Sequence, residues 1–284
     1  MPEAPGFSVC PILSVVSSFL KRLRALCAWT GLLGGAALLS ACWLPPLTAR
    51  QPYKVHKVVI DAGHGGKDRG CNGKNAYEAD VALKLALALG QRIEDSMPGV
   101  KVVYTRKTDV FVELAERAAI ANRANADVFI SIHLNSGPVS VRGTEIWIMG
   151  PAKSDANLAV AKRENAVVLQ EKNYEEKYGG FDPRSPQSHI LFSLFQSAYM
   201  ENSLRLAEQV DRQLRAVKRP SRGVKQAGFL VLWKTAMPSV LIEAGFLTNA
   251  ADERYLNDSA GQAYTAQAIF KAFKSYKKQL EALD

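Results

Sequence analysis

In Val58-Val59-Ile60-Asp61-Ala62-Gly63-His64-Gly65-Gly66, an apolar run of β-branched residues ends in a glycine-rich turn. Glycines permit sharp backbone turns, so this pattern predicts a buried strand that leads into a loop. His64 then lies at the carboxyl end of the strand. Ligands of open α/β sheets bind in the crevice beyond that end, and we therefore expect His64 to face a site.

The same arrangement occurs twice more along the chain. An apolar run over 127–132 leads to His133, and a run over 239–242 leads to Glu243. Glu78 opens a segment whose apolar residues are spaced one helical turn apart. Two histidines and one carboxylate, with a fourth position left to water, are a common ligand set of catalytic zinc. The sequence thus predicts a zinc site made by His64, Glu78 and His133, with Glu243 as the general base.

Other interpretations of these residues stay open. A neutral histidine can also cap a strand end through a hydrogen bond, and this applies to His64 and His133 taken singly. Cys71 lies between His64 and Glu78 and is a less favoured candidate for a thiolate ligand, because the predicted set is already complete.

Strands and helices are expected to alternate along the chain. This order predicts an α/β fold with a central, mostly parallel (mixed) sheet flanked by helices on both faces. After the first strand, five more strands are expected: 100–105, 127–132, 143–149 as a candidate edge strand, 229–232 and 239–242. One helix is expected to begin at Glu78, and three others are expected over 111–123, 203–217 and 260–282.

Five separated blocks carry a resemblance to a known family: Ile60–Gly66, Glu78, Thr105–Asp109, Ser131–Asn135 and Glu243–Asn249. In these blocks the sequence resembles the zinc-dependent N-acetylmuramoyl-L-alanine amidases of the amidase 3 type, over residues 57–280. The resemblance implies a cell-wall hydrolase that uses one Zn²⁺ ion. Its reaction would be cleavage of the amide between N-acetylmuramic acid and L-alanine in peptidoglycan, during wall remodelling and daughter-cell separation. Ala62 departs from the family pattern, which more often has proline there.

Residues 151–200 interrupt the alternation and are interpreted as a helical regulatory insertion over the active site. In family members that cleave septal peptidoglycan, a glutamate of such a helix fills the open zinc position until an activator protein displaces it. The segment 157–165 resembles the start of that element, so the resemblance makes Glu164 the candidate inhibitory fourth ligand. A solvated charge is the equally weighted alternative, and Glu171, Glu175 and Glu176 are competing candidates.

Two further residues are candidates for substrate contacts, namely Asn135 and Arg106. Arg106 is better explained as a structural residue that closes a strand-to-helix turn with Asp109. A contact between Arg106 and a substrate carboxylate is the alternative.

The first forty residues have the pattern of an export signal. Lys21–Arg24 precede an apolar stretch over 25–39, as in a charged region followed by a hydrophobic core of secretory length. Leu39–Cys42 resembles a lipoprotein cleavage motif in which Cys42 becomes lipidated, and ordinary cleavage near Thr48–Arg50 is the alternative. We therefore divide the chain into a leader (1–42), a tether (43–56) and a catalytic domain (57–284), and expect an exported, periplasmic, membrane-anchored lipoprotein.

The chain of 284 residues has a formal net charge of +9 and a pI of about 9.4. A basic excess suits an anionic partner, although a solvated basic face is the more common explanation of such a charge. The expected partners are peptidoglycan, a membrane through the lipid anchor and a protein activator, with no nucleic acid. Two rival functions are a catalytically silent wall-binding or activator-binding module and another zinc amidohydrolase. The intact set of ligands and base favours an enzyme.

Overall fold

A computed structural model describes residues 54–193 and 199–282. Its centre is a six-stranded sheet with the order β2-β1-β3-β6-β4-β5. The strands are β1 (Lys57–Ala62), β2 (Lys101–Tyr104), β3 (Val128–Asn135), β4 (Thr144–Met149), β5 (Ser221–Ala227) and β6 (Ser239–Phe246).

The sheet is mostly parallel, as predicted. Neighbouring strands are parallel except at β4, which pairs with β6 in the antiparallel sense. β4 lies between β6 and β5, so its predicted placement at an edge is wrong. The edge beyond it belongs to β5, where charged Arg222 and Lys225 replace the apolar run by which a strand is predicted.

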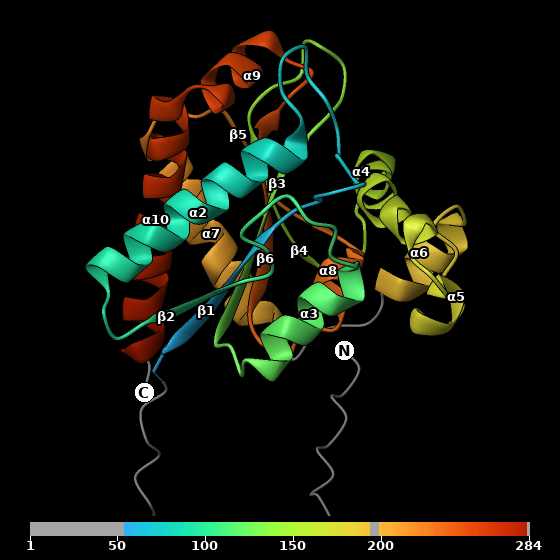
Figure 1. Ribbon diagram of the computed structural model, residues 1–284, viewed down its shortest axis with the longest axis horizontal. Coiled ribbons are helices and arrows are strands. Elements are labelled where there is room, and N and C mark those ends of the chain that lie inside the picture. Colours follow the sequence, from blue (N-terminus) through green and yellow to red (C-terminus); the bar gives the residue numbers. More distant parts are fainter. Residues whose placement is uncertain (1–53, 194–198, 283–284) are drawn as a thin grey trace, which may run out of the picture. The chain divides into compact units, whose positions relative to one another are not determined.

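Helices cover both faces of the sheet (Figure 1). Between the sheet and these helices lie two hydrophobic cores. One face carries α2 (Glu78–Ser96), α7 (Met200–Ala216), α9 (Ala250–Asn257) and α10 (Ser259–Glu281), and the other carries α3 (Leu114–Arg123) and α8 (Leu230–Trp233). Successive residues of β1 serve opposite cores, because Val58 and Ile60 pack under α2 while Val59 joins the core under α3. Full burial of each such side chain contributes on the order of 1.5–3 kcal/mol. Burial on both faces explains why β1 is a continuous apolar run.

The apolar segment 229–232 is mostly helical, and its prediction as a strand is wrong. Residues Leu230–Trp233 form the single turn α8, packed in the core with Phe129 and Trp147. An apolar run this short fits a buried strand and a buried helical turn equally well.

The predicted helical insertion forms α4 (Asp155–Asn165), the 3₁₀ helix η1 (Ala166–Gln170), α5 (Tyr174–Lys177) and α6 (Pro186–Ser193). α4 begins at an N-cap, where the Ser154 hydroxyl accepts a hydrogen bond from the backbone N–H of Asn157. Its last residue, Asn165, donates to the carbonyl of Gly228 at 2.7 Å and accepts from the N–H of Leu230 at 2.9 Å. The C-terminal end of α4 is thereby fixed to the start of α8.

The leader, the lipidation candidate Cys42 and the tether up to residue 53 lie outside the described residues, so these predictions stay predictions. Within 54–193 and 199–282, no helix is both long enough and apolar enough to span a bilayer.

Candidate metal centre

His64 lies on the loop after β1, in a left-handed backbone conformation with φ 57°. Its Nδ1 lies 2.7 Å from Oδ2 of Asp68, which the loop brings back toward the ring. A proton shared between Nδ1 and a carboxylate leaves the Nε2 lone pair for a cation. Asp68 could not be predicted from the sequence, because its orienting role depends on how the glycine-rich loop turns.

Glu78 is the first residue of α2, and two backbone N–H groups fix its carboxylate. Oε1 accepts from Leu134 and Oε2 accepts from Cys71, each at 2.9 Å. Oε1 also lies 3.1 Å from Nε2 of His64 and 3.1 Å from Nδ1 of His133. The start of α2 therefore holds this carboxylate between the two histidines.

His133, on β3, reaches the same point over the backbone of Gly63. A Cβ placed on Gly63 would lie 2.5 Å from Cε1 of the His133 ring, closer than a carbon can approach. Glycine at position 63 is thus required by the ring above it.

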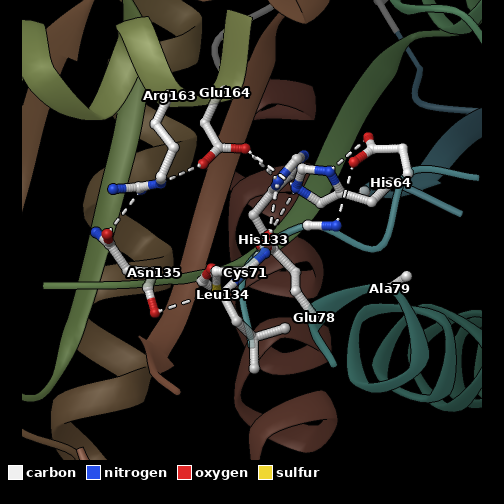
Figure 2. A network of polar contacts seen from close by, with 12 residues as sticks. His64, Cys71, Glu78, Ala79, His133, Leu134, Asn135, Arg163 and Glu164 are labelled. Atoms are coloured by element: carbon white, nitrogen blue, oxygen red, sulfur yellow. Dashed lines mark hydrogen bonds and ion pairs between the residues drawn. The ribbon is translucent and has the colours of Figure 1, made fainter. Parts of the chain in front are cut away.

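Glu164, near the end of α4, completes the cluster (Figure 2). Its Oε2 lies 3.2 Å from Nε2 of His64 and 3.0 Å from Nδ1 of His133. One ligand atom from each of His64, Glu78, His133 and Glu164 lies within 4.8 Å of the others. Nε2 of His64 and Oε2 of Glu164 are buried without a hydrogen-bond partner. Two nitrogens and two carboxylate oxygens that converge in this way fit the donor set of zinc.

The electrostatics of the cluster favour a cation. Burial alone would lower the pKa of His64 and of His133, but Glu78 raises the first well above its usual value and Glu164 raises the second to about 9. Burial alone would raise the pKa of Glu78, but His64 lowers it to about 2. The two carboxylates thus attract positive charge to the point where the ligand atoms meet, and a metal ion can supply that charge.

Glu243 stands beside the cluster on β6, where its Cα pairs with that of His133. Its side chain is fully buried, and neither carboxylate oxygen has a hydrogen-bond partner. Burial, with the charges of Glu164 and Glu78, raises the pKa of Glu243 well above its usual value. The nearest cation is Arg163 of α4, whose Nη2 lies 3.7 Å away. A carboxyl group that has no hydrogen bond and a raised pKa, and that lies next to convergent metal-ligand atoms, is suited to accept and return a proton.

The other glutamates of the insertion do not reach the cluster. Glu171 is buried elsewhere and accepts from the N–H of Leu114 at 2.9 Å, while Glu175 and Glu176 are exposed. Glu164 is 5% exposed, so it is not a solvated charge. Cys71 also stays outside the cluster, because its thiol donates to the carbonyl of Leu134 at 3.1 Å and burial raises its pKa.

The two candidates for substrate contacts differ in their surroundings. Arg106 is buried, and its guanidinium donates to the carbonyls of Ala62, Gly63, Ala79 and Thr108, which gives it a structural role in the His64 loop. Asn135 lies at the end of β3, next to the cluster. Its Oδ1 accepts from Nη2 of Arg163 at 2.8 Å, and its Nδ2 donates to Oε2 of Glu145 at 2.8 Å.

A buried network under the His64 loop fixes the end of β1. Asp61 accepts hydrogen bonds from Thr105, Ser131 and Arg117. Burial alone would raise the pKa of Asp61, but the charge of Arg117 and the hydrogen bonds from Ser131 and Thr105 together outweigh it, and the pKa is lowered. Arg117 also donates to the carbonyls of Ala62 and His64 at 2.6 and 2.8 Å. The structure therefore pairs Arg117 with Asp61, an interaction that the sequence analysis missed.

Comparison with known proteins assigns a family to this arrangement. The family model described as N-acetylmuramoyl-L-alanine amidase matches residues 58–275. The chain is 32% identical to protein YqiI of Bacillus subtilis, with 92% of this chain and 98% of that protein covered. It is 32% identical to the amidase AmiA of Escherichia coli, with 77% and 75% covered. The solved N-acetylmuramoyl-L-alanine amidase of Clostridium difficile superposes with a TM-score of 0.58 at 28% identity, over 79% of this chain and 97% of that one. With its sheet, its cluster and these matches considered together, the chain belongs to the N-acetylmuramoyl-L-alanine amidase family of the Amidase_3 type.

Proposed function

We propose that this protein is a zinc-dependent amidase that cleaves the bond between N-acetylmuramic acid and L-alanine in peptidoglycan. Family membership supports the substrate class. The observation that supports the mechanism is the buried carboxyl group of Glu243, which has no hydrogen bond and lies beside the convergent atoms of His64, Glu78 and His133.

In the proposed mechanism the metal activates the carbonyl and the water, and side chains of the protein hold the metal and transfer the proton. When bound, zinc would polarise the scissile carbonyl and lower the pKa of the attacking water. His64, Glu78 and His133 would hold it, and Asp68 would orient His64. Glu243 would accept the proton that water loses as its oxygen bonds to the carbonyl carbon. The same proton then passes to the alanine nitrogen as the C–N bond breaks, because an amine leaves poorly without protonation.

We further propose that the described conformation is autoinhibited. Glu164 occupies the position that a substrate carbonyl needs, since its Oε2 lies within 3.2 Å of one nitrogen of each histidine. Arg163 supports it by lying against both Glu164 and Asn135. Activity would then require α4 to move away, which fits displacement by a protein activator during cell separation. We also propose export as a lipoprotein through Cys42.

The test is hydrolysis of purified peptidoglycan by zinc-loaded protein spanning residues 43–284, with products identified by mass. Glu243→Gln keeps the shape of the side chain and removes its basicity, so we expect kcat to fall about 10²- to 10⁴-fold. Glu164→Ala is expected to raise the rate about tenfold or more, because an open state populated at about 10% or less becomes the main one.

The products decide between the functions. Release of stem peptides with a free L-alanine amine supports the amidase. Cleavage at a different bond points to another zinc amidohydrolase. Binding of the polymer without turnover by any of the three forms overturns the enzyme and supports the silent wall-binding module.

A further inference from the structure

A second cavity lies beside the metal centre, between α4 and the outer strands of the sheet. Its volume is about 350 Å³. It shares Ser136 and Arg163 with the cavity at the cluster, so the two spaces adjoin. Its polar lining consists largely of side chains from β3, β4, β5 and α4: Asn135, Glu145, Arg163, Arg222 and Lys225.

Glu145 organises the charges of this second cavity. It is 2% exposed, and its Oε1 accepts from Nε of Arg222 at 2.8 Å and from Nζ of Lys225 at 2.5 Å. Its Oε2 accepts from Asn135 at 2.8 Å. One buried carboxylate therefore meets two cations, which leaves an excess of positive charge facing the cavity.

Both cations are held in place and keep unused donors. The Arg222 guanidinium lies over the ring of Phe246 at 5.7 Å, and Lys225 lies over Trp147 at 5.2 Å. Among the described residues, Arg222 hydrogen-bonds to protein through Nε alone, although 41% of its side chain is exposed. Its two Nη groups form the planar fork that matches a carboxylate.

The sheet fixes how far these cations lie from the reacting groups. Glu243 pairs in register with His133 on one side and with Glu145 on the other, and β5 is the next strand beyond β4. Neighbouring strands lie about 4.8 Å apart, so β5 runs roughly 10 Å from the backbone of Glu243. An extended peptide advances about 3.3–3.6 Å per residue. The second or third residue beyond the reacting amide therefore reaches Arg222 and Lys225.

We propose that Arg222 and Lys225 form a subsite for a carboxylate on the peptide arm of the substrate, at the second or third residue from the cleaved bond. This inference rests on the proposed amidase function. The subsite belongs to the sheet, because Glu145 on β4 and not α4 holds the two cations. It therefore stays assembled when α4 leaves the metal centre.

The alternative is that the two cations only neutralise Glu145. The two roles differ in substrate dependence. A structural role affects every substrate equally, whereas a binding role affects only substrates that carry the carboxylate. The probes are N-acetylmuramoyl tripeptides with acidic residues, together with the same compounds amidated at one carboxylate at a time.

The enzyme is the zinc-loaded Glu164→Ala protein, with Arg222→Gln or Lys225→Gln added, and with Arg205→Gln as the matched control. Arg205 is an arginine of α7 with 42% of its side chain exposed, and among the described residues it pairs only with Glu201. For one carboxylate position we expect the parent to prefer the free acid about tenfold in kcat/KM, mainly through KM, as for a charge-assisted hydrogen bond. Arg222→Gln and Lys225→Gln should each reduce this preference to about twofold or less and leave the amidated substrate unaffected. Arg205→Gln should change neither.

Two results would overturn the inference alone: a parent enzyme that cleaves free and amidated substrates equally well, or variants that lose the same factor on both. A parent enzyme that cleaves neither these substrates nor peptidoglycan would overturn the proposed function, and the subsite with it.

Discussion

At the scale of single residues, the metal centre requires a glycine, which has no side chain, at position 63. Gly63 lets the His133 ring lie against the backbone of the loop, where a Cβ would be 2.5 Å from the ring. Gly63 has an ordinary negative φ, so only the lack of space excludes alanine. A substitution at Gly63 therefore acts by displacing the His133 ring and not by straining the backbone.

We predict that Gly63→Ala lowers zinc affinity about 10- to 100-fold, as when a group that orients a ligand is lost, because the ring must move away from the cluster. The measurement is competition for zinc with a chelator. Gly99→Ala is the matched control, since a Cβ there meets no atom within 4 Å. Equal affinities of the two variants would contradict the close approach of Gly63 to His133.

The sequence predicts those site residues whose position follows from secondary structure. His133 and Glu243 lie on predicted strands, and Glu78 opens a predicted helix, so the parallel sheet places them at one edge. Asp68 and Arg163 depend on how a loop and an inserted helix fold back, which no spacing in the chain encodes. Arg117 and Asp61 are 56 residues apart in sequence, and their pairing exists only once α3 packs on β1.

At the scale of elements, α4 is fastened at its C-terminal end. Asn165 makes two buried hydrogen bonds there, to Gly228 and Leu230, immediately after the residue that enters the cluster. The next segment is fastened again, because Glu171 and Tyr178 accept from the first N–H groups of α3, at Leu114 and Ala115. The contacts at its C-terminal end therefore hold α4 in the closed position, and weakening them should favour its release.

We predict that Asn165→Ala activates the enzyme. Loss of the Asn165 amide leaves the N–H of Leu230 buried and unpaired in the closed state, at a cost of about 1–3 kcal/mol. The fraction of molecules in which α4 has left the metal centre therefore rises roughly 5- to 150-fold, until nearly all molecules are open. Peptidoglycan hydrolysis should increase, and hydrogen exchange should accelerate in α4. Asn257→Ala, at an exposed asparagine, is the control.

In the Glu164→Ala background, Asn165→Ala should add little, because the open state is already populated. Full activation by Asn165→Ala in that background would contradict a shared mechanism.

The central strands could be predicted from the sequence, whereas the edge strand β5 could not. The central strands are apolar on both faces, and their run of β-branched residues reveals them. β5 is an edge strand whose Arg222 and Lys225 donate hydrogen bonds to Glu145, so its sequence lacks the apolar run. The features that hide β5 from sequence analysis are those that give it a proposed role in substrate binding.

At the scale of the whole molecule, the cluster joins side chains that come from both faces of the sheet. Glu78 comes from a helix on one face, and Glu164 comes from the insertion packed against the other. The histidines come from the central strand β3 and the loop after β1. A metal ion bound by all four would therefore stabilise the domain as a unit, by an amount that grows with its concentration relative to Kd.

We predict that zinc raises the midpoint of thermal unfolding of the wild type, and raises it less for Glu164→Ala, which keeps three ligands. Zinc at about 1,000 times its Kd stabilises a folded protein by about 4 kcal/mol, and a tenfold weaker site reduces this by about 1.4 kcal/mol. Glu175→Ala is the matched control, because Glu175 is an exposed glutamate of the same insertion, and it should respond to zinc as the wild type does. The measurement needs no substrate, so it tests the fourth ligand independently of activity. If Glu164→Ala and Glu175→Ala gain equal stability from zinc, Glu164 blocks the centre without coordinating the metal, and inhibition rests on steric exclusion alone.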